Sequence, residues 1–391
     1  MSPPVNSVTS FATTSYDTAF PENAAEMLAR LSAPVLRHAT FRRRDLGRHC
    51  RRSTVSRRIC MRILIIGGTR FLGRAIAEYA VGRAHDVTLF HRAKSMPNGL
   101  PGAASIAGDR AHDLGKITEP YDAIVDTCAY LPRDVVASCT HIRRLSPNAT
   151  YVLISSASVY RDGFPSGADE SAPTIDDGDP HAGEMTLETY GALKALCERA
   201  AIECFGNNAF VVRPGLIVGP YDGSDRFTYW VRRIGAGGRV LVPAPPDRAV
   251  QFVDVRDLAG WIVAALEARC TGTFNATGPE YRLTFGTLLD ACRTALQSDA
   301  EFFWAPQAFL KAHEVEPWTQ MPLWIPDDEA GGWDEISSRR AIDAGLRFRP
   351  LRDTILDTAR WDRSRDQNVP LKAGITAERE AALLKELEQT A

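Results

Sequence analysis

The stretch Met61-Arg-Ile-Leu-Ile-Ile-Gly-Gly-Thr-Arg-Phe-Leu-Gly73 decides the fold of this 391-residue chain. Its four consecutive aliphatic residues, Ile63 to Ile66, predict a strand that is buried on both faces. The glycine pair that follows leads into a helical pattern over residues 71–83. This order suits a pyrophosphate, because glycine lets the backbone approach closely and the helix N-terminus presents unpaired N–H groups. The sequence therefore predicts a phosphate site made of Gly67, Gly68, Thr69, Arg70, Phe71, Leu72 and Gly73.

Short apolar runs alternate with helical patterns from residue 61 onward. We expect strands at residues 62–67, 86–91, 105–108, 122–127 and 150–155, with helices at residues 71–83 and 133–145. This alternation predicts an α/β fold with a doubly wound parallel sheet of the Rossmann type. Further helices are expected at residues 255–268, 283–296, 351–361 and 377–388.

The end of the second expected strand bears on the choice of cofactor. A dinucleotide fold that prefers NAD places an acid there for the ribose hydroxyls, whereas this chain has His91 followed by Arg92. Arg70, at a position of the glycine turn where glycine is usual, lies close by. Two guanidinium groups suit a 2′-phosphate, so the sequence favours NADP(H), with NAD(H) as the alternative. The two arginines could also be solvated surface residues. Asp109, after the third strand, is expected to meet the adenine amino group.

A candidate catalytic group follows the fifth strand. Ser156 stands at the end of that strand, and Tyr190 and Lys194 are four residues apart in a helical stretch, hence on one face. An ammonium beside a phenol favours the phenolate and lowers the tyrosine pKa, so that Tyr190 can act as acid and base. Ser156 can then hold the substrate oxygen. Alone, the Tyr–Lys pair could equally be a surface pair on a helix.

These segments resemble the short-chain dehydrogenase/reductase superfamily, specifically its extended, epimerase/dehydratase-like branch. The resemblance covers residues 61–363 and includes the Ile-Ser-Ser-Ala-Ser-Val-Tyr strand end and the Arg-Pro-Gly-Leu-Ile-Val-Gly-Pro and Gln-Phe-Val-Asp-Val-Arg-Asp-Leu segments. It implies that Tyr190 is the acid/base, that Lys194 binds the nicotinamide ribose and depresses the tyrosine pKa, and that Ser156 orients the substrate oxygen.

The resemblance also has departures. Sugar-nucleotide 4,6-dehydratases of this branch carry an Asp-Glu pair where this chain has Ala157-Ser158. The Gly-Gly-Thr-Arg-Phe-Leu-Gly turn is similar to a subgroup that contains plant chloroplast stem-loop-binding proteins, some of which bind RNA. Retention of Tyr190, Lys194 and Ser156 together favours an enzyme.

The turn-rich residues 215–363 are expected to form a smaller C-terminal substrate-binding lobe, interleaved with the last elements of the 61–214 core. Tyr221, Arg226 and Trp230 place a cation beside aromatic rings, which suits a flat or ring-shaped substrate. Such a run is also typical of helix core. Residues 304–333, rich in Pro and Trp, are expected to be irregular and to help close the site.

The two ends of the chain differ from its middle. Residues 1–60 are rich in Ser, Pro and Arg and predict disorder. They could be a transit peptide, a nucleic-acid-binding arm or sequence upstream of a true start at Met61, and we favour the last. Residues 364–391 look like a charged C-terminal tail that forms a solvated face or binds a partner.

Composition restricts the classes of function. A net charge of −2 predicts neither a polyanion partner nor an anionic membrane surface, and no apolar run approaches the length of a membrane span. The eight cysteines are scattered without metal spacing, which predicts reduced thiols and no metal site. We expect a cytoplasmic protein.

The sequence therefore predicts an NADP(H)-dependent oxidoreductase that interconverts a carbonyl and a hydroxyl on a small-molecule substrate. One alternative is a sugar-nucleotide epimerase that retains NAD. A second is a non-catalytic RNA-binding or redox-sensing protein, although nucleic acid is an unlikely partner at this net charge. A homodimer is common in families of this kind.

Overall fold

The glycine turn lies at the centre of a seven-stranded parallel sheet. The computed structural model describes Met27, Leu31 and residues 60–94, 96, 99–326 and 331–390. The strand order is β10-β6-β5-β4-β1-β2-β3. The strands are β1 (Arg62–Ile66), β2 (Asp86–His91), β3 (Ala103–Ala107), β4 (Ala123–Asp126), β5 (Thr150–Ile154), β6 (Ala209–Pro214) and β10 (Gly272–Ala276). The predicted Rossmann-type α/β fold is confirmed.

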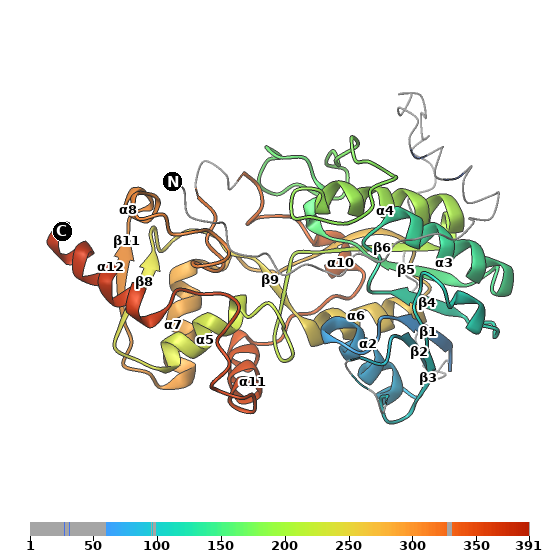
Figure 1. The fold of residues 1–391 in the computed structure, drawn as a ribbon, viewed down its shortest axis with the longest axis horizontal. Coiled ribbons are helices and arrows are strands. Elements are labelled where there is room, and N and C mark those ends of the chain that lie inside the picture. The colour runs from blue at the N-terminus through green and yellow to red at the C-terminus, as the bar shows by residue number, and fades with distance from the viewer. Residues whose placement is uncertain are drawn as a thin grey trace, which may run out of the picture.

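Helices cover both faces of this sheet (Figure 1). On one face lie α2 (Phe71–Gly82) and α6 (Val255–Glu267), and on the other α3 (Pro132–Leu145) and α4 (Tyr190–Phe205). Successive residues of β1 serve the two cores in turn, because side chains alternate along a strand. Ile63 and Ile65 pack with α2, and Leu64 and Ile66 with α3.

Edge strand β3 differs most from its expected bounds. It begins at Ala103, whereas the sequence indicated residue 105. Its residues are small and partly exposed, so they carry little of the apolar signal that marks the buried strands. The other expected strands and helices match the observed ones within two residues at each end.

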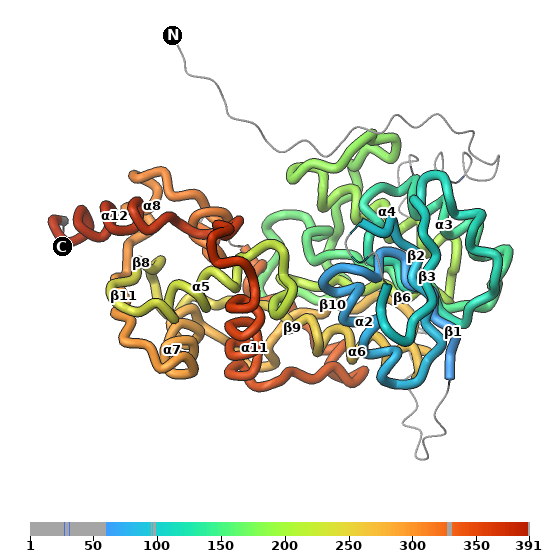
Figure 2. Tube along the Cα trace, turned by 60° about the horizontal axis from the view of Figure 1, so that its bottom comes forward, coloured from blue at the N-terminus to red at the C-terminus, as the bar shows by residue number. Residues whose placement is uncertain are grey.

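A smaller lobe lies at the other end of the molecule (Figures 1 and 2). It contains α5 (Arg226–Gly235), β8 (Arg239–Pro243), α7 (Phe285–Leu296), β11 (Glu301–Ala305), α8 (Gln307–Ala312), α11 (Leu351–Arg363) and α12 (Ala377–Thr390). Strands β8 and β11 pair in parallel. The lobe has its own apolar core around Trp230, Phe285 and Trp324. Strands β7 (Leu216–Val218) and β9 (Phe252–Asp254) form the connection to the sheet domain, and the short helix α10 (Arg339–Asp343) returns to β10.

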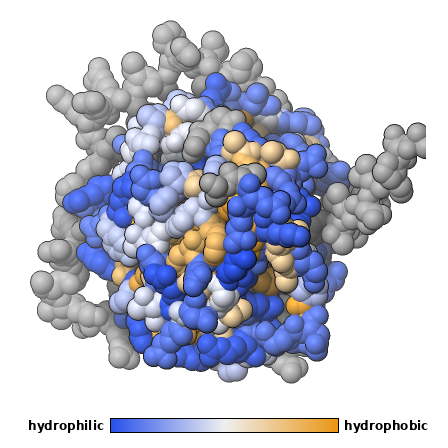
Figure 3. All heavy atoms as spheres, turned by 90° about the vertical axis from the view of Figure 1, so that its left-hand side faces the viewer, coloured by the Kyte–Doolittle hydropathy of each residue, from blue (hydrophilic) through white to orange (hydrophobic). Residues whose placement is uncertain are grey.

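The charged C-terminal segment is part of this smaller lobe. Helix α12 packs on β8, and Leu383 and Leu384 are buried in the lobe core. Glu380 is also buried, since its carboxylate accepts hydrogen bonds from the Leu241 amide (3.0 Å) and from Arg233 (2.6 Å). The other charged residues of α12 face outward, where the end of the lobe is mostly hydrophilic around a hydrophobic strip (Figure 3). The predicted tail is therefore only half solvated, because its apolar residues recur at helical spacing.

The N-terminal prediction falls largely outside the described residues. Within residues 1–60 the structure describes Met27, Leu31 and Cys60. Leu31 is buried in the core beneath α3 and α4, and Met27 packs against the same cluster.

The cysteine prediction is wrong at one position. Cys60, Cys128, Cys139, Cys197, Cys204 and Cys292 are free thiols, as expected, whereas Cys270 is disulfide-bonded. Cys270 has little exposed surface and directly precedes β10. Its spacing along the sequence carries no sign of the pairing.

The buried carboxylate of α12 gives a test of this packing. Replacing Glu380 with Ala should lower the free energy of unfolding by about 3 kcal/mol, because it leaves the Leu241 amide and Arg233 without their acceptor. The measurement is chemical denaturation followed by tryptophan fluorescence. Glu378→Ala, on the exposed side of the same helical turn, should change stability by no more than about 0.5 kcal/mol. Equal small effects of both substitutions would show that α12 does not stabilise the lobe.

Candidate functional site

The glycine turn brings β1, α2 and the end of β4 into close contact. Gly67 has φ +90°, and a Cβ there would lie 2.7 Å from the Thr127 hydroxyl. A Cβ on Gly73 would lie 2.8 Å from the Gly67 carbonyl oxygen. Only glycine fits such approaches. Arg70 caps α2 without a side-chain hydrogen bond to the described helix, so the amides of its first turn remain open to an anion.

The end of β2 carries no carboxylate. His91 is buried; its Nδ1 accepts a hydrogen bond from the Ala93 amide (3.0 Å), and its Nε2 lies 2.5 Å from the Ser105 hydroxyl. Burial lowers the pKa of His91, which keeps the imidazole neutral. Arg70 and Arg92 are both exposed at this edge. The chain therefore presents two cations here and no acid for ribose hydroxyls.

Asp109 shapes the turn after β3. Its carboxylate accepts a hydrogen bond from the Ala111 amide (3.0 Å), and its own amide donates to Asp113 (2.8 Å). The next residue, Arg110, was not singled out from the sequence. Its guanidinium binds Asp126, at the end of β4, through two hydrogen bonds of 3.0 and 2.8 Å. This pair ties the predicted adenine edge to the central strands.

The ion pair between Arg110 and Asp126 is buried. Burial alone would raise the pKa of Asp126, but Arg110 and the Tyr151 hydroxyl (2.7 Å) bring it below its ordinary value. The carboxylate therefore stays charged. Breaking such a pair leaves an uncompensated buried charge, so the pair fixes the geometry of this edge.

The three predicted catalytic residues lie at the carboxyl ends of β4 and β5. Lys194 is 3% exposed, and its ammonium donates to the carbonyl oxygens of Ala129 (2.7 Å) and Ile154 (2.6 Å). Ser156 caps the short 3-10 turn η2 (Ala157–Val159) by accepting a hydrogen bond from the Ser158 amide (3.1 Å). Tyr190 is the first residue of α4.

Gly191 allows α4 to begin directly against this turn. A Cβ at Gly191 would lie 2.1 Å from the Ser158 carbonyl oxygen. Tyr190 and the Ser156 turn are therefore neighbours, and Lys194 lies one helical turn further along. Within the described chain, Lys194 uses two of its three N–H donors, and the third is available to a ligand.

Behind these residues lies a buried polar network that the sequence analysis missed. Glu198, one turn after Lys194, accepts a hydrogen bond from the Ser155 hydroxyl (2.5 Å). Arg213 binds the same carboxylate (2.7 Å) and also donates to the Tyr160 hydroxyl (3.0 Å). The network joins β5, β6 and α4. The four-residue spacing from Lys194 to Glu198 was the available signal, because it continues the face that carries Tyr190.

The predicted substrate residues separate into two groups. Tyr221 is 45% exposed, and the Arg74 guanidinium lies 3.9 Å from its ring centroid. Arg226 is partly buried, with its guanidinium 5.3 Å from the Trp318 ring.

Trp230 contradicts the prediction of substrate contact. It is fully buried, donates to the Pro322 carbonyl (2.8 Å) and packs edge-on against Phe285. The helix-core interpretation holds for Trp230, because α5 turns this face into the lobe.

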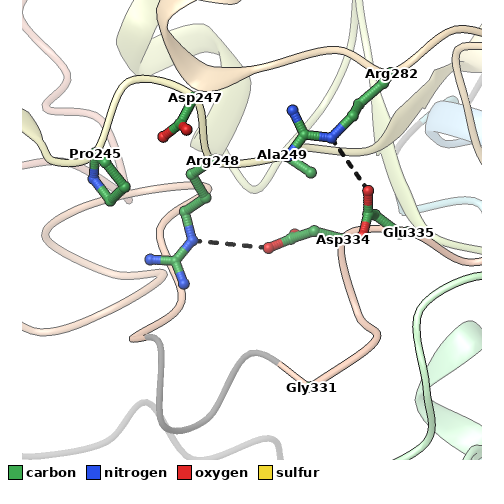
Figure 4. Close-up of a pocket in the computed structure, with 8 residues that line it drawn as sticks. All are labelled: Pro245, Asp247, Arg248, Ala249, Arg282, Gly331, Asp334 and Glu335. Carbon is green, nitrogen blue, oxygen red and sulfur yellow. Dashed lines mark hydrogen bonds and ion pairs between the residues drawn. The ribbon is translucent and has the colours of Figure 1, made fainter.

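A charged pocket of about 220 Å³ opens beside residues 331–335 (Figure 4). Arg248 and Asp334 face each other across it, with Nε and Oδ2 3.9 Å apart, and Arg282 pairs with Glu335 at 3.2 Å. Burial raises the pKa of Asp334 to about 7, against the opposing effect of Arg248. Perturbed acids in pockets mark candidate binding sites. Trp333, next to Asp334, packs edge-on against Phe164 in the segment that follows η2.

Two further properties concern the described residues alone. They contain no group of three or more His, Cys, Asp or Glu side chains arranged to hold a metal ion. Among their helices, none combines the length and apolar character needed to cross a membrane.

The raised pKa of Asp334 predicts a pH-dependent stability. Between its ordinary value of 3.8 and about 7, the folded chain holds a proton that the unfolded chain releases, so stability falls as pH rises through this range. Asp334→Asn removes this loss. The free energy of unfolding of the variant minus that of the wild type should therefore increase by about 2 kcal/mol between about pH 5 and about pH 8, as measured by denaturant unfolding. Asp290→Asn, an exposed acid on α7, should show a flat difference. A flat difference for both variants would contradict the raised pKa.

Comparison with known proteins agrees with this architecture. The NAD dependent epimerase/dehydratase family model matches residues 63–276. The chain is 28% identical over 254 residues to "Chloroplast stem-loop binding protein of 41 kDa b, chloroplastic" of Arabidopsis thaliana, across 60% of this chain and 63% of that protein. The chain thus spans slightly less than two thirds of this relative.

Solved structures share the fold at low identity. The human epimerase family protein SDR39U1 (isoform 2) with NADPH has a TM-score of 0.53 at 20% identity, covering 77% of this chain and 99% of that one. The UDP-glucuronic acid 4-epimerase of Bacillus cereus in complex with NAD has a TM-score of 0.56 at 16% identity, covering 78% and 99%. The family match spans more than half of the chain and confirms the predicted resemblance at the level of the family: this protein belongs to the NAD-dependent epimerase/dehydratase family.

Proposed function

We propose that this protein is an NADP(H)-dependent oxidoreductase that interconverts a carbonyl and a hydroxyl on a small molecule. The observation that carries the proposal is the group around Lys194: a buried ammonium held by two backbone carbonyls, with Tyr190 one turn before it and the Ser156 turn against the helix start. A buried charge with an open donor is costly unless a ligand or reaction uses it.

The residues present fit a nicotinamide dinucleotide. The glycine turn would hold the pyrophosphate, because Gly67 and Gly73 let the chain turn tightly from β1 into α2 and because the first-turn amides of α2 are open. The third N–H of Lys194 would bind the nicotinamide ribose. When bound, this cofactor supplies or accepts a hydride.

The chain itself manages the proton. Tyr190 would give a proton to the substrate oxygen during reduction and take it back during oxidation. The Ser156 hydroxyl would hold the same oxygen in place. Lys194 would stabilise the phenolate by its positive charge, and the contacts of its ammonium with Ala129 and Ile154 prevent it from moving away.

The preference for NADP(H) rests on the edge of β2. The neutral, hydrogen-bonded His91 offers no carboxylate for ribose hydroxyls, and Arg70 and Arg92 would bind a 2′-phosphate. The human relative, which contains NADPH, supports the same choice, whereas the Bacillus cereus epimerase contains NAD.

Two other functions compete with this proposal. A sugar-nucleotide epimerase would use the same three residues but keep its cofactor bound, so nucleotide that co-purifies and survives dialysis would favour it. An RNA-binding role, suggested by the name of the chloroplast relative, would appear as salt-dependent RNA binding. The group formed by Ser156, Tyr190 and Lys194 favours an enzyme over this second alternative.

The role of Tyr190 has a direct test. Tyr190→Phe keeps the ring and removes the proton donor, so NADPH-dependent carbonyl reduction should fall by about 100-fold or more. NADPH affinity, measured by calorimetry, should stay within about twofold of the wild type. Tyr79→Phe, on the exposed surface of α2, is the matched control and should leave both quantities unchanged. Substantial reduction by the Tyr190 variant would refute the assignment.

The cofactor preference is tested by titration with NADP⁺ and NAD⁺. Replacing Arg92 or Arg70 with Ala should weaken NADP⁺ binding by about tenfold each and leave NAD⁺ binding unchanged, because only NADP⁺ carries the 2′-phosphate. Arg144→Ala, an exposed arginine on α3, should affect neither. Equal weakening for both nucleotides would assign the arginines to a contact shared by NAD⁺ and NADP⁺.

A further inference from the structure

Tyr130 is an aromatic residue at the reaction end of the sheet that the sequence motifs do not mark. It lies in the connection between β4, which ends at Asp126, and α3, which begins at Pro132. In an open parallel sheet, ligands bind at this carboxyl edge. Tyr130 is 43% exposed.

The position of Tyr130 is fixed by Lys194. The Lys194 ammonium donates to the carbonyl oxygen of Ala129, the preceding residue, at 2.7 Å. The same nitrogen lies 5.7 Å from the centroid of the Tyr130 ring. On the other side, Leu131 is buried and caps α3. The base of the side chain is therefore anchored next to Lys194, while 43% of the residue's surface remains exposed.

The hydroxyl of Tyr130 is open to a ligand. It has no hydrogen-bond partner among the residues that the structure describes. Although nearly half of the residue is exposed, burial of the phenol, together with a smaller effect of Tyr190, raises the pKa of Tyr130 to about 12. The Tyr130 hydroxyl therefore stays protonated at neutral pH and can donate a hydrogen bond.

The two phenols come from different elements, and both residues are neighbours of Lys194. Tyr190 begins α4 one helical turn before Lys194, and the ring centroid of Tyr130 lies 5.7 Å from the Lys194 ammonium nitrogen. No hydrogen bond joins the two hydroxyls within the described chain, so each can bind an atom of a ligand beside Lys194. A substrate that satisfied both would carry two oxygens on neighbouring carbons, one for each hydroxyl.

We propose that Tyr130 is a specificity-determining residue that donates a hydrogen bond to an oxygen on the carbon next to the reacting one. The inference rests on the proposed oxidoreductase function and narrows its substrate class to vicinal dioxygenated compounds, such as 1,2-diketones and α-hydroxyketones. In reduction, the reacting carbon accepts the hydride and its oxygen accepts the Tyr190 proton. Tyr130 keeps its own proton throughout, so its contribution is to binding and orientation.

The energetic reason is the cost of an unpaired donor. A simple ketone satisfies Tyr190 and Ser156 but leaves the partly buried Tyr130 hydroxyl without an acceptor. Sites that hydrogen-bond a substrate group discriminate strongly against analogues that lack it. Removing the hydroxyl from the protein should therefore remove the preference, while the reaction itself continues.

The experiment compares two probes, 1-phenylpropane-1,2-dione and 1-phenylpropan-1-one, with NADPH as the reductant. For each protein, kcat/KM is measured for both probes from the loss of NADPH absorbance, and NADPH affinity is measured by calorimetry. Tyr130→Phe should lower the dione-to-ketone ratio of kcat/KM by about tenfold or more relative to the wild type, through the dione alone. Tyr79→Phe, at 42% exposure, should leave the ratio unchanged.

Comparing the dione-to-ketone ratio between variant and wild type isolates specificity. A loss of folded protein lowers both kcat/KM values equally, and the intrinsic reactivity of the dione is the same for both proteins. Equal losses for both probes, or an unchanged ratio, would overturn the role of Tyr130 while the proposed function stands. A wild-type protein that binds NADPH and reduces the ketone but not the dione would also overturn it. A wild-type protein that binds no NADPH would instead overturn the proposed function itself.

Discussion

The buried ammonium of Lys194 is the interaction on which the arrangement of the site depends. Moving such a charge out of water costs several kcal/mol, and the carbonyl oxygens of Ala129 and Ile154 offset that cost only if both are within reach. Because these carbonyls follow β4 and β5, one side chain sets the spacing of two strand ends and α4. Tyr190, the Ser156 turn and Tyr130 all take their positions from this junction.

A second layer of buried charge holds the junction rigid. Glu198 and Arg213 form an ion pair beneath it; Glu198 also binds Ser155, and Arg213 also binds Tyr160. A second buried ion pair, between Arg110 and Asp126, lies below the predicted adenine edge. Each carboxylate is matched by a bidentate arginine, the geometry that best repays desolvation. These pairs connect the carboxyl ends of β4, β5 and β6 to neighbouring segments and so hold the strand ends in place. The smaller lobe combines its own apolar core with pairs of the same kind, such as the buried Asp362, which Arg232 binds through two hydrogen bonds of 2.7 Å.

Much of the sheet domain could be predicted from the chain, and so could the three residues of the proposed catalytic group. Aliphatic runs such as Ile63 to Ile66 are buried on both faces in any parallel sheet, so their pattern carries the fold. The spacing from Tyr190 to Lys194 could also be interpreted from the sequence, because residues four apart lie on one face of a helix. The exposed β3 and the half-buried α12 were harder, because small or charged residues mask their pattern.

Other features depend on contacts between segments distant in the chain. Tyr130 lies beside the proposed site only because Lys194, 64 residues later in the sequence, binds the carbonyl oxygen of the preceding residue. Arg248 and Asp334 are also distant in the sequence, yet they line one pocket. Trp230 belongs to the core of the smaller lobe because α5 turns that face inward. The sequence by itself determined the strand–turn–helix units and the local spacing of reactive groups, since these follow from backbone periodicity. Only the tertiary structure decided which side chains are desolvated together, since burial and pairing are set by the packing of distant segments.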